Sequence, residues 1–231
     1  NNLCSSRPNE EKYTFSAVFE MDNKGKIYSE WFGRTVIKSD NRFSYEEIQQ
    51  VIETGKPYIS KTISLVKQEY YISNSTFKAV LELNNIAKEL RNKRLELGAL
   101  SFDRVEVGFN LNEKNEPESI KLKESKESNK LVEEFMLLAN KKVAGFINKK
   151  RPVKPFIYRV HDEPDIEKIK NLKNLVNTFG YKLETANKDL TKSLNNLLLN
   201  IKGKPEQNMI DTLTLRCMSK AVYTTNNIGH Y

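Results

Sequence analysis

The sequence predicts an α+β fold in which short paired strands alternate with long amphipathic helices. Residues 13–21 and 26–37 are rich in aromatic and β-branched side chains and flank a turn-forming segment, the pattern of a β-hairpin. Residues 76–97 and 129–149 repeat apolar positions at helical spacing. Because no internal repeat or heptad array occurs, one mixed domain is the simplest interpretation and a solenoid is disfavoured.

The first third of the chain is expected to hold a hairpin and a short helix. Asp22 and Gly25 lie between the first two strands and favour a tight turn. Ser44 and Glu47 have capping-box spacing, which predicts a helix that begins there and ends near Gly55. Residues 56–75 favour neither helix nor strand.

Two long helices separated by a strand pair are expected next. The helix over residues 76–97 has an apolar face and is ended by Gly98; the face consists of Val80, Leu83, Ile86, Ala87, Leu90 and Leu97. Residues 100–111 alternate apolar and polar side chains as a strand does, and residues 117–123 are its expected partner. The helix over residues 129–149 is expected to pack one face against a core: Val132, Phe135, Met136, Ala139, Val143, Phe146 and Ile147.

The last third is expected to consist of one strand and three helices. Residues 155–161 form a short apolar run typical of a strand. Helices are predicted over residues 165–179, where Gly180 ends the helix, and over residues 187–201 and 205–222.

The bulk composition indicates a protein without disulfides, and its basic charge leaves a polyanionic partner open. The net charge of +8 fits a nucleic-acid partner but equally serves solubility. Cys4 and Cys217 have neither disulfide-framework nor zinc-site spacing, so a reducing cytoplasm is the expected location. No apolar run reaches the roughly 18 residues of a membrane span. Both ends read as mid-chain sequence, so a fragment is expected.

Glu134 is the carboxylate most open to a functional interpretation. Its helical neighbours Leu131, Leu137 and Leu138 are apolar, so its side of the helix is expected to be buried as well. A buried carboxylate needs a cation, a hydrogen-bond network or a function. A structural ion pair or a partly exposed position explains the same pattern.

Arg159 and His161 lie where the expected strand gives way to a loop, a common place for ligand contacts. A lone histidine beside carboxylates is more often structural.

Four aromatic side chains stand among Lys and Arg: Phe102, Tyr158, Tyr223 and Tyr231. This mixture is typical of proteins that bind single-stranded nucleic acid, although aromatic residues in strands usually belong to the core. No carboxylate cluster indicates a two-metal site.

Five segments in order resemble the catalytic RNB domain of the ribonuclease II and ribonuclease R family, processive exonucleases that degrade RNA from its 3′ end. They read LCSSRPNE (3–10), GALSFD (98–103), LVEEFMLLAN (131–140), YRVHDEP (158–164), and LRCMSKAVY with NIGHY (215–231). Ser6, Cys217 and Tyr231 depart from the usual family residues, and each change is conservative.

The resemblance implies roles for several residues. Phe102 would stack on a base, and Glu134 would organise the catalytic end of the channel by holding an arginine that faces the scissile phosphate. The remaining positions that the family motifs place on the RNA are Asn140, Arg159, His161, Tyr223 and His230. The expected partner is single-stranded RNA, with neither a membrane nor an obligate protein partner.

The resemblance also implies a magnesium-dependent enzyme whose metal ligands are absent from this chain. The family's aspartate cluster and its arginine motif have no counterpart in residues 1–231, so the chain alone is expected to be inactive. Two alternatives remain open: a nucleic-acid-binding module without hydrolytic activity, and a structural or protein-interaction domain in which Phe102 and Glu134 are a core residue and an ion-pair partner.

Overall fold

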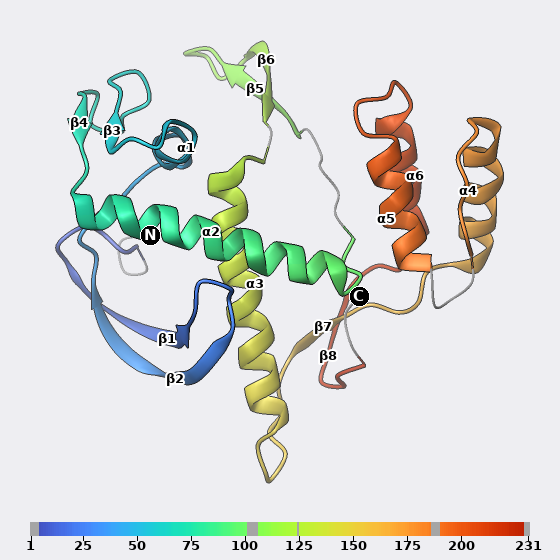
Figure 1. The fold of residues 1–231 in the computed structure, drawn as a ribbon, viewed down its shortest axis with the longest axis horizontal. Coiled ribbons are helices and arrows are strands. Elements are labelled where there is room, and N and C mark those ends of the chain that lie inside the picture. The colour runs from blue at the N-terminus through green and yellow to red at the C-terminus, as the bar shows by residue number, and fades with distance from the viewer. Residues whose placement is uncertain (1–4, 101–105, 124, 186–189, 229–231) are drawn as a thin grey trace. The chain divides into compact units, whose positions relative to one another are not determined.

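The computed structural model describes residues 5–100, 106–123, 125–185 and 190–228 (Figure 1). The described helices are α1 Tyr45–Thr54, α2 Asn74–Glu96, α3 Glu127–Asn148, α4 Ile166–Thr178, α5 Leu190–Asn200 and α6 Gln207–Cys217. The strands are β1 Glu11–Met21, β2 Ile27–Lys38, β3 Tyr58–Ile59, β4 Tyr70–Tyr71, β5 Glu106–Leu111, β6 Pro117–Lys123, β7 Tyr158–Val160 and β8 Val222–Thr224. They pair as four two-stranded antiparallel sheets, so the predicted α+β class is confirmed.

The chain divides into two compact units. The first unit comprises Asn1–Asn92 and Lys126–Ile147, and the second comprises Lys93–Ser125 and Asn148–Tyr231. The first unit therefore holds β1 to β4, α1 and most of α2 and α3. The second holds β5 to β8 and α4 to α6.

The predicted hairpin of the first unit is confirmed as β1 and β2. Asp22 organises its turn, because one carboxylate oxygen accepts the backbone N–H groups of Lys24 and Lys26, both at 2.9 Å. Gly25 has a φ of +69°, and a Cβ at this position would lie 2.9 Å from a methyl carbon of Leu90. Glycine is needed there both for the backbone conformation and for the contact with α2.

The predicted capping box is present at the start of α1. The Ser44 hydroxyl accepts the Glu47 N–H at 3.2 Å, and the Glu47 carboxylate accepts the Ser44 N–H at 2.7 Å. The helix ends at Gly55, which is left-handed, as the sequence indicates. Its buried Val51 packs with Ile59 and Ile72, so the unassigned residues 56–75 complete a small core through β3 and β4.

The predicted apolar faces of the two long helices are covered only in part. In α2, Ile86 and Ala87 are buried and Leu83 is exposed, and Leu97, which follows the helix, is exposed as well. In α3, Phe146 packs on Phe32 of β2 with ring centroids 4.9 Å apart, but Met136 is 60% exposed and Val132 is also exposed. The predicted packing of the α3 face against a core is therefore only partial, because Phe146 packs on β2 whereas Val132 and Met136 lie exposed.

The second unit has the larger apolar core, formed by α4, α5 and α6. Its fully buried members include Val176, Leu194, Ile201 and Ile210. Asp165 caps α4 by accepting the N–H groups two and three residues ahead. The predicted pair of strands is also present as β5 and β6, although residues 101–105 of the expected strand lie outside the described residues.

Two predicted elements of the second unit are shorter than expected. The strand predicted over residues 155–161 is β7, which spans only Tyr158–Val160. The helix predicted over residues 205–222 ends at Cys217, because Met218 adopts an extended backbone and Val222 begins β8. Val222 instead pairs with Val160 of β7, and the Cys217 carbonyl accepts the Asp165 N–H, so tertiary contacts override the local helical pattern.

Candidate nucleic-acid interface

The β7–β8 ribbon brings together two of the predicted RNA-binding residues. Arg159 lies directly opposite Tyr223 in the antiparallel register, and side chains of directly opposite residues share one face. Tyr158 and Val160 flank Arg159 and are buried, so strand alternation turns Arg159 outward. Tyr223 is 76% exposed. The ribbon thus presents a guanidinium beside an open aromatic ring, whereas Tyr158 has the core position that aromatic residues in strands usually take.

His161 follows the ribbon and ties it to the segment after α6. Its Nδ1 lies 3.0 Å from the Ser219 carbonyl oxygen. A carbonyl oxygen only accepts hydrogen bonds, so Nδ1 carries the hydrogen. Ser219 in turn donates its hydroxyl to the Glu163 carbonyl at 2.7 Å, and the Asp165 N–H donates to the Cys217 carbonyl at 3.0 Å. The position fits the structural interpretation of this histidine, and its contact with RNA stays a prediction.

Glu134 and Asn140 lie on α3, in the first unit. Glu134 is only 3% exposed, so its predicted burial is confirmed, although its helical neighbour Leu137 is exposed. Asn140 is exposed. Phe102 and His230, the two other predicted RNA-binding residues, lie outside the described residues.

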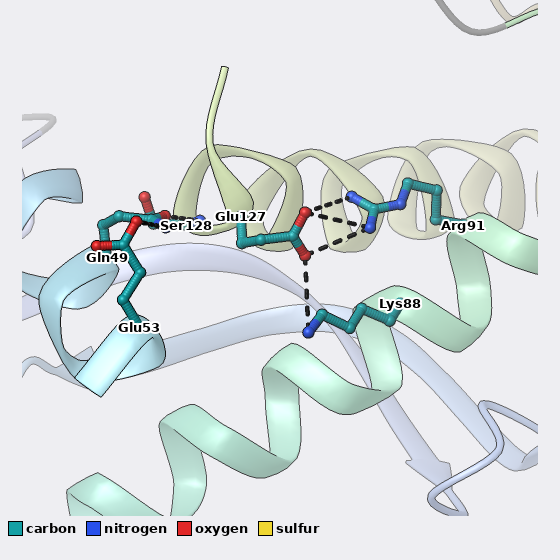
Figure 2. A network of polar contacts seen from close by, with 6 residues as sticks. All are labelled: Gln49, Glu53, Lys88, Arg91, Glu127 and Ser128. Carbon is teal, nitrogen blue, oxygen red and sulfur yellow. Dashed lines mark hydrogen bonds and ion pairs between the residues drawn. The ribbon is translucent and has the colours of Figure 1, made fainter. Parts of the chain in front are cut away.

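A polar network that the sequence did not indicate holds the start of α3, seven residues before Glu134 (Figure 2). Arg91 of α2 donates to both carboxylate oxygens of Glu127 at 3.2 to 3.3 Å, and the Lys88 ammonium lies 4.0 Å away. The Glu127 carboxylate lies in the first turn of α3, where the positive end of the helix dipole also stabilises its negative charge. Two cations from α2 therefore fix the first residue of α3.

The next residue of α3 is held by α1. The buried backbone N–H of Ser128 donates to the Gln49 side-chain oxygen at 2.9 Å, and the Gln49 amide donates to Glu53 at 2.8 Å. Gln49 thus satisfies one of the N–H groups that a helix start leaves unpaired. The helix that carries Glu134 is consequently anchored to two other helices at its first turn. Only the spacing of Lys88 and Arg91 on one helix face could have indicated part of this arrangement.

Glu47 is a second buried carboxylate that the sequence presented only as a capping residue. It is fully buried, and beyond the Ser44 N–H it accepts the Leu65 N–H at 3.0 Å and the Tyr70 hydroxyl at 2.9 Å. Burial, together with the hydrogen bond to Glu47 and its negative charge, raises the pKa of Tyr70 to about 12. Glu47 thereby joins α1, the 60–69 loop and β4.

The described residues do not fit a magnesium site. Among residues 5–100, 106–123, 125–185 and 190–228, no group of three or more His, Cys, Asp or Glu side chains is placed to hold a metal ion. Both Glu47 and Glu127 are already engaged by donors or cations of this chain. In the same described part of the chain, no helix combines the length and apolar character needed to cross a bilayer.

Comparisons with known proteins agree with the resemblance seen in the sequence motifs. Ribonuclease R of Aquifex aeolicus is 31% identical over 229 residues, which are 99% of this chain and 31% of that protein. DIS3-like exonuclease 2 of Caenorhabditis elegans is 34% identical over 230 residues, 96% of this chain and 26% of that protein. The chain thus spans about a third or less of the length of these curated relatives.

Solved structures show the same fold. Mycoplasma genitalium RNase R in complex with ribose methylated single-stranded RNA matches with a TM-score of 0.86 at 22% identity, over 100% of this chain and 34% of that chain. Yeast Ssd1, described as a pseudonuclease, matches with a TM-score of 0.68 at 22% identity, over 100% of this chain and 27% of that chain. The family model described as RNB domain matches residues 1–231. Because that match covers all 231 residues, the chain belongs to the RNB domain family.

Proposed function

We propose that the chain is part of a cytoplasmic, Mg²⁺-dependent 3′→5′ exoribonuclease that hydrolyses single-stranded RNA processively to nucleoside 5′-monophosphates. The whole-chain family match and the similarity to ribonuclease R support this proposal. The RNA partner is also supported by the net charge of +8.

The observation that carries the RNA contact is the Arg159–Tyr223 pair on the outer face of the β7–β8 ribbon. The guanidinium offers planar, charged donors to phosphate oxygens, and the tyrosine ring offers a face on which a base can stack. Every base has such a face, so this contact tolerates any sequence. That tolerance is what an enzyme that moves along RNA one nucleotide at a time requires.

The other predicted residues take supporting roles in this proposal. Glu134, buried on the helix that α1 and α2 anchor, holds an arginine that faces the scissile phosphate, and so acts on the RNA indirectly. Phe102 stacks on a base, while Asn140, His161 and His230 line the RNA path. These roles come from the family motifs, and His161 additionally fixes the loop after β7.

The metal-dependent step is proposed to use the family's aspartate cluster, which has no counterpart in the sequence of residues 1–231. The 231-residue chain is therefore expected to be inactive alone. The test is an exonuclease assay with Mg²⁺ on end-labelled single-stranded RNA, which compares this chain with a longer one from the parent reading frame that includes the family's aspartate cluster and arginine motif. Hydrolysis by the longer chain only supports the proposal, and hydrolysis by the short chain refutes the assignment of the metal ligands.

A second candidate function is RNA binding without hydrolysis. The similarity in fold to Ssd1, a pseudonuclease, favours considering it. If neither chain hydrolyses RNA but both bind it, this second function replaces the first.

A further inference from the structure

The β3–β4 ribbon of the first unit has one buried and one exposed face. Ile59 pairs with Tyr70 and faces the core of the unit, where Ile59 is fully buried. Tyr58 pairs with Tyr71 on the opposite face, because neighbouring residues in a strand point to opposite sides. Tyr71 is 74% exposed, so this short ribbon displays aromatic surface that the rest of the described unit leaves uncovered.

The two tyrosines form a defined pair. Their ring centroids are 5.3 Å apart with a tilt of 54° between the planes. The Tyr58 hydroxyl donates to the Glu69 carboxylate at 2.9 Å, which holds that ring in place. Tyr71 therefore rests against a fixed neighbour, so the rotamer entropy lost when a ligand stacks on it is small.

The backbone beneath the pair is also held firmly. Glu47 accepts the Leu65 N–H and the Tyr70 hydroxyl, and the Ile72 N–H donates to the Pro57 carbonyl at 2.9 Å. The Ser60 N–H donates to Gln50 of α1 at 3.0 Å. The exposed aromatic face is thus mounted on a rigid base, as binding sites built on regular elements usually are.

The charge around the ribbon favours a polyanion. Lys56, Lys61 and Lys67 are exposed in the segment from residue 56 to residue 71, which contains a single acidic residue, Glu69. The Glu69 carboxylate is already engaged by the Tyr58 hydroxyl. Aromatic faces combined with lysines are the chemistry of sequence-tolerant binders of single strands, whereas an apolar protein partner would gain nothing from the three charges.

We propose that the β3–β4 ribbon is a second contact for single-stranded RNA, at which one unpaired base stacks on Tyr71 while the neighbouring lysines attract the phosphates. The inference rests on RNA being the partner, as in the proposed function. It uses residues of the first unit that share no member with the Arg159–Tyr223 pair. Each contact can therefore fail without the other.

The first test measures the affinity of the 231-residue chain for a fluorescein-labelled poly(U) oligonucleotide by fluorescence anisotropy. Tyr71→Leu is expected to raise the Kd at least about fivefold, because leucine lacks the flat π-face, whereas Tyr71→Phe is expected to leave the Kd unchanged. Tyr45→Leu is the matched control, since Tyr45 is an exposed tyrosine on α1 of the same unit. The melting temperature of each variant is measured alongside, because a purely structural role would change stability and not affinity.

The lysines are tested by the salt dependence of binding. Each lysine that contacts a phosphate contributes about 0.7 to the slope of log Kd against log salt for single strands. Lys61→Gln with Lys67→Gln is expected to reduce that slope by about 1.4 if both make contact. Glu69→Gln, which removes the only acidic side chain of the segment, is expected to tighten binding. A slope that is unchanged in the double variant overturns the part assigned to the lysines.

The second test locates the contact by photocrosslinking with 5-iodouridine in the same oligonucleotide. Tryptic peptide 68–78 contains Tyr71, and peptide 221–231 contains Tyr223. Crosslinks in both peptides support both contacts. A crosslink only in 221–231, with an unchanged Kd for Tyr71→Leu, overturns this inference and leaves the proposed function standing; the ribbon would then be a protein contact that also uses the exposed Leu65 and Val66. A crosslink only in 68–78 supports the β3–β4 contact and overturns the contact at Tyr223. If the unmodified chain does not bind RNA, both contacts are overturned.

Discussion

Replacing Glu47 with alanine is expected to destabilise the first unit by about 3 to 6 kcal/mol. The substitution strands three donors that now converge on one carboxylate: the Ser44 N–H at 2.7 Å, the Leu65 N–H at 3.0 Å and the Tyr70 hydroxyl at 2.9 Å. A buried donor left without a partner costs about 1 to 3 kcal/mol. The lower half of that range applies to each, because all three bonds are only partly buried and water can recover some of the loss.

The assay is urea denaturation followed by tryptophan fluorescence. Trp31 is the single tryptophan of the chain and lies on β2, so it reports on the first unit. Glu47→Gln keeps the shape and one acceptor oxygen and is expected to cost less than Glu47→Ala. Glu46→Ala is the control: Glu46 is exposed on the first turn of the same helix, where losing a favourable helix-dipole contact costs about 0.3 to 1 kcal/mol.

The same contact makes a prediction about pH. Tyr70 has its pKa raised to about 12, first by burial and then by the hydrogen bond to Glu47 and its charge. A raised folded-state pKa means that the stability contribution is complete below the ordinary value of 10 and is lost as pH rises toward about 12. In Glu47→Ala only burial remains, so the pKa of Tyr70 is expected to fall toward 10. The pKa of Tyr70 is measured from tyrosinate absorbance at 295 nm, with Tyr70→Phe as the reference. A loss of stability under about 0.5 kcal/mol together with an unchanged Tyr70 titration would refute the reasoning.

Three further outcomes are expected. Arg91→Ala and Glu127→Ala should show a coupling energy of roughly 1 kcal/mol in a double-mutant cycle, since the pair is bidentate but its side chains are 21% and 29% exposed. The coupling energy should shrink in 1 M salt. Additive losses of stability would mean that the contact contributes nothing. Tyr223→Ala should weaken binding of single-stranded RNA by at least about fivefold without lowering the melting temperature, because its ring is exposed; an equal Kd would remove it from the RNA interface. In a Cys4→Ser background, Cys217 should react slowly with a disulfide reagent in the native chain and rapidly in urea, because burial raises the pKa of its thiol; equal rates would show that the thiol is accessible.

Local patterns predicted most helices and strands where one short-range rule decided the outcome. The Ser44–Glu47 spacing located the start of α1, and the turn at Asp22 located the β1–β2 hairpin. The same rules were wrong for residues 218–222, where the helix ends at Cys217, Met218 is extended and Val222 begins a strand that pairs with β7. They also left residues 56–75 unassigned, because strands of two residues are too short to show a period.

Part of the candidate site could be predicted from the sequence. Arg159 and Tyr223 could be named from motifs, but their position opposite one another depends on pairing between segments 64 positions apart. The burial of Glu134 followed from its apolar neighbours and is confirmed. Apart from the spacing of Lys88 and Arg91, the anchoring of α3 by Gln49 and Arg91 carries no short-range signal, because each partner comes from a different helix.

The sequence by itself determined the family and the α+β class, because these depend on side-chain types, short spacings and the order of motifs; the residues that it assigns to RNA stay predictions. Tertiary structure alone decided which carboxylates are engaged and which aromatic rings face solvent. Glu47 and Tyr71 show the reason: a carboxylate becomes an anchor, and a ring becomes a platform, only when distant segments bring donors to one and leave the other uncovered. Burial and hydrogen-bond partnership are properties of the packed chain wherever the partners come from distant segments, and no local pattern encodes them there.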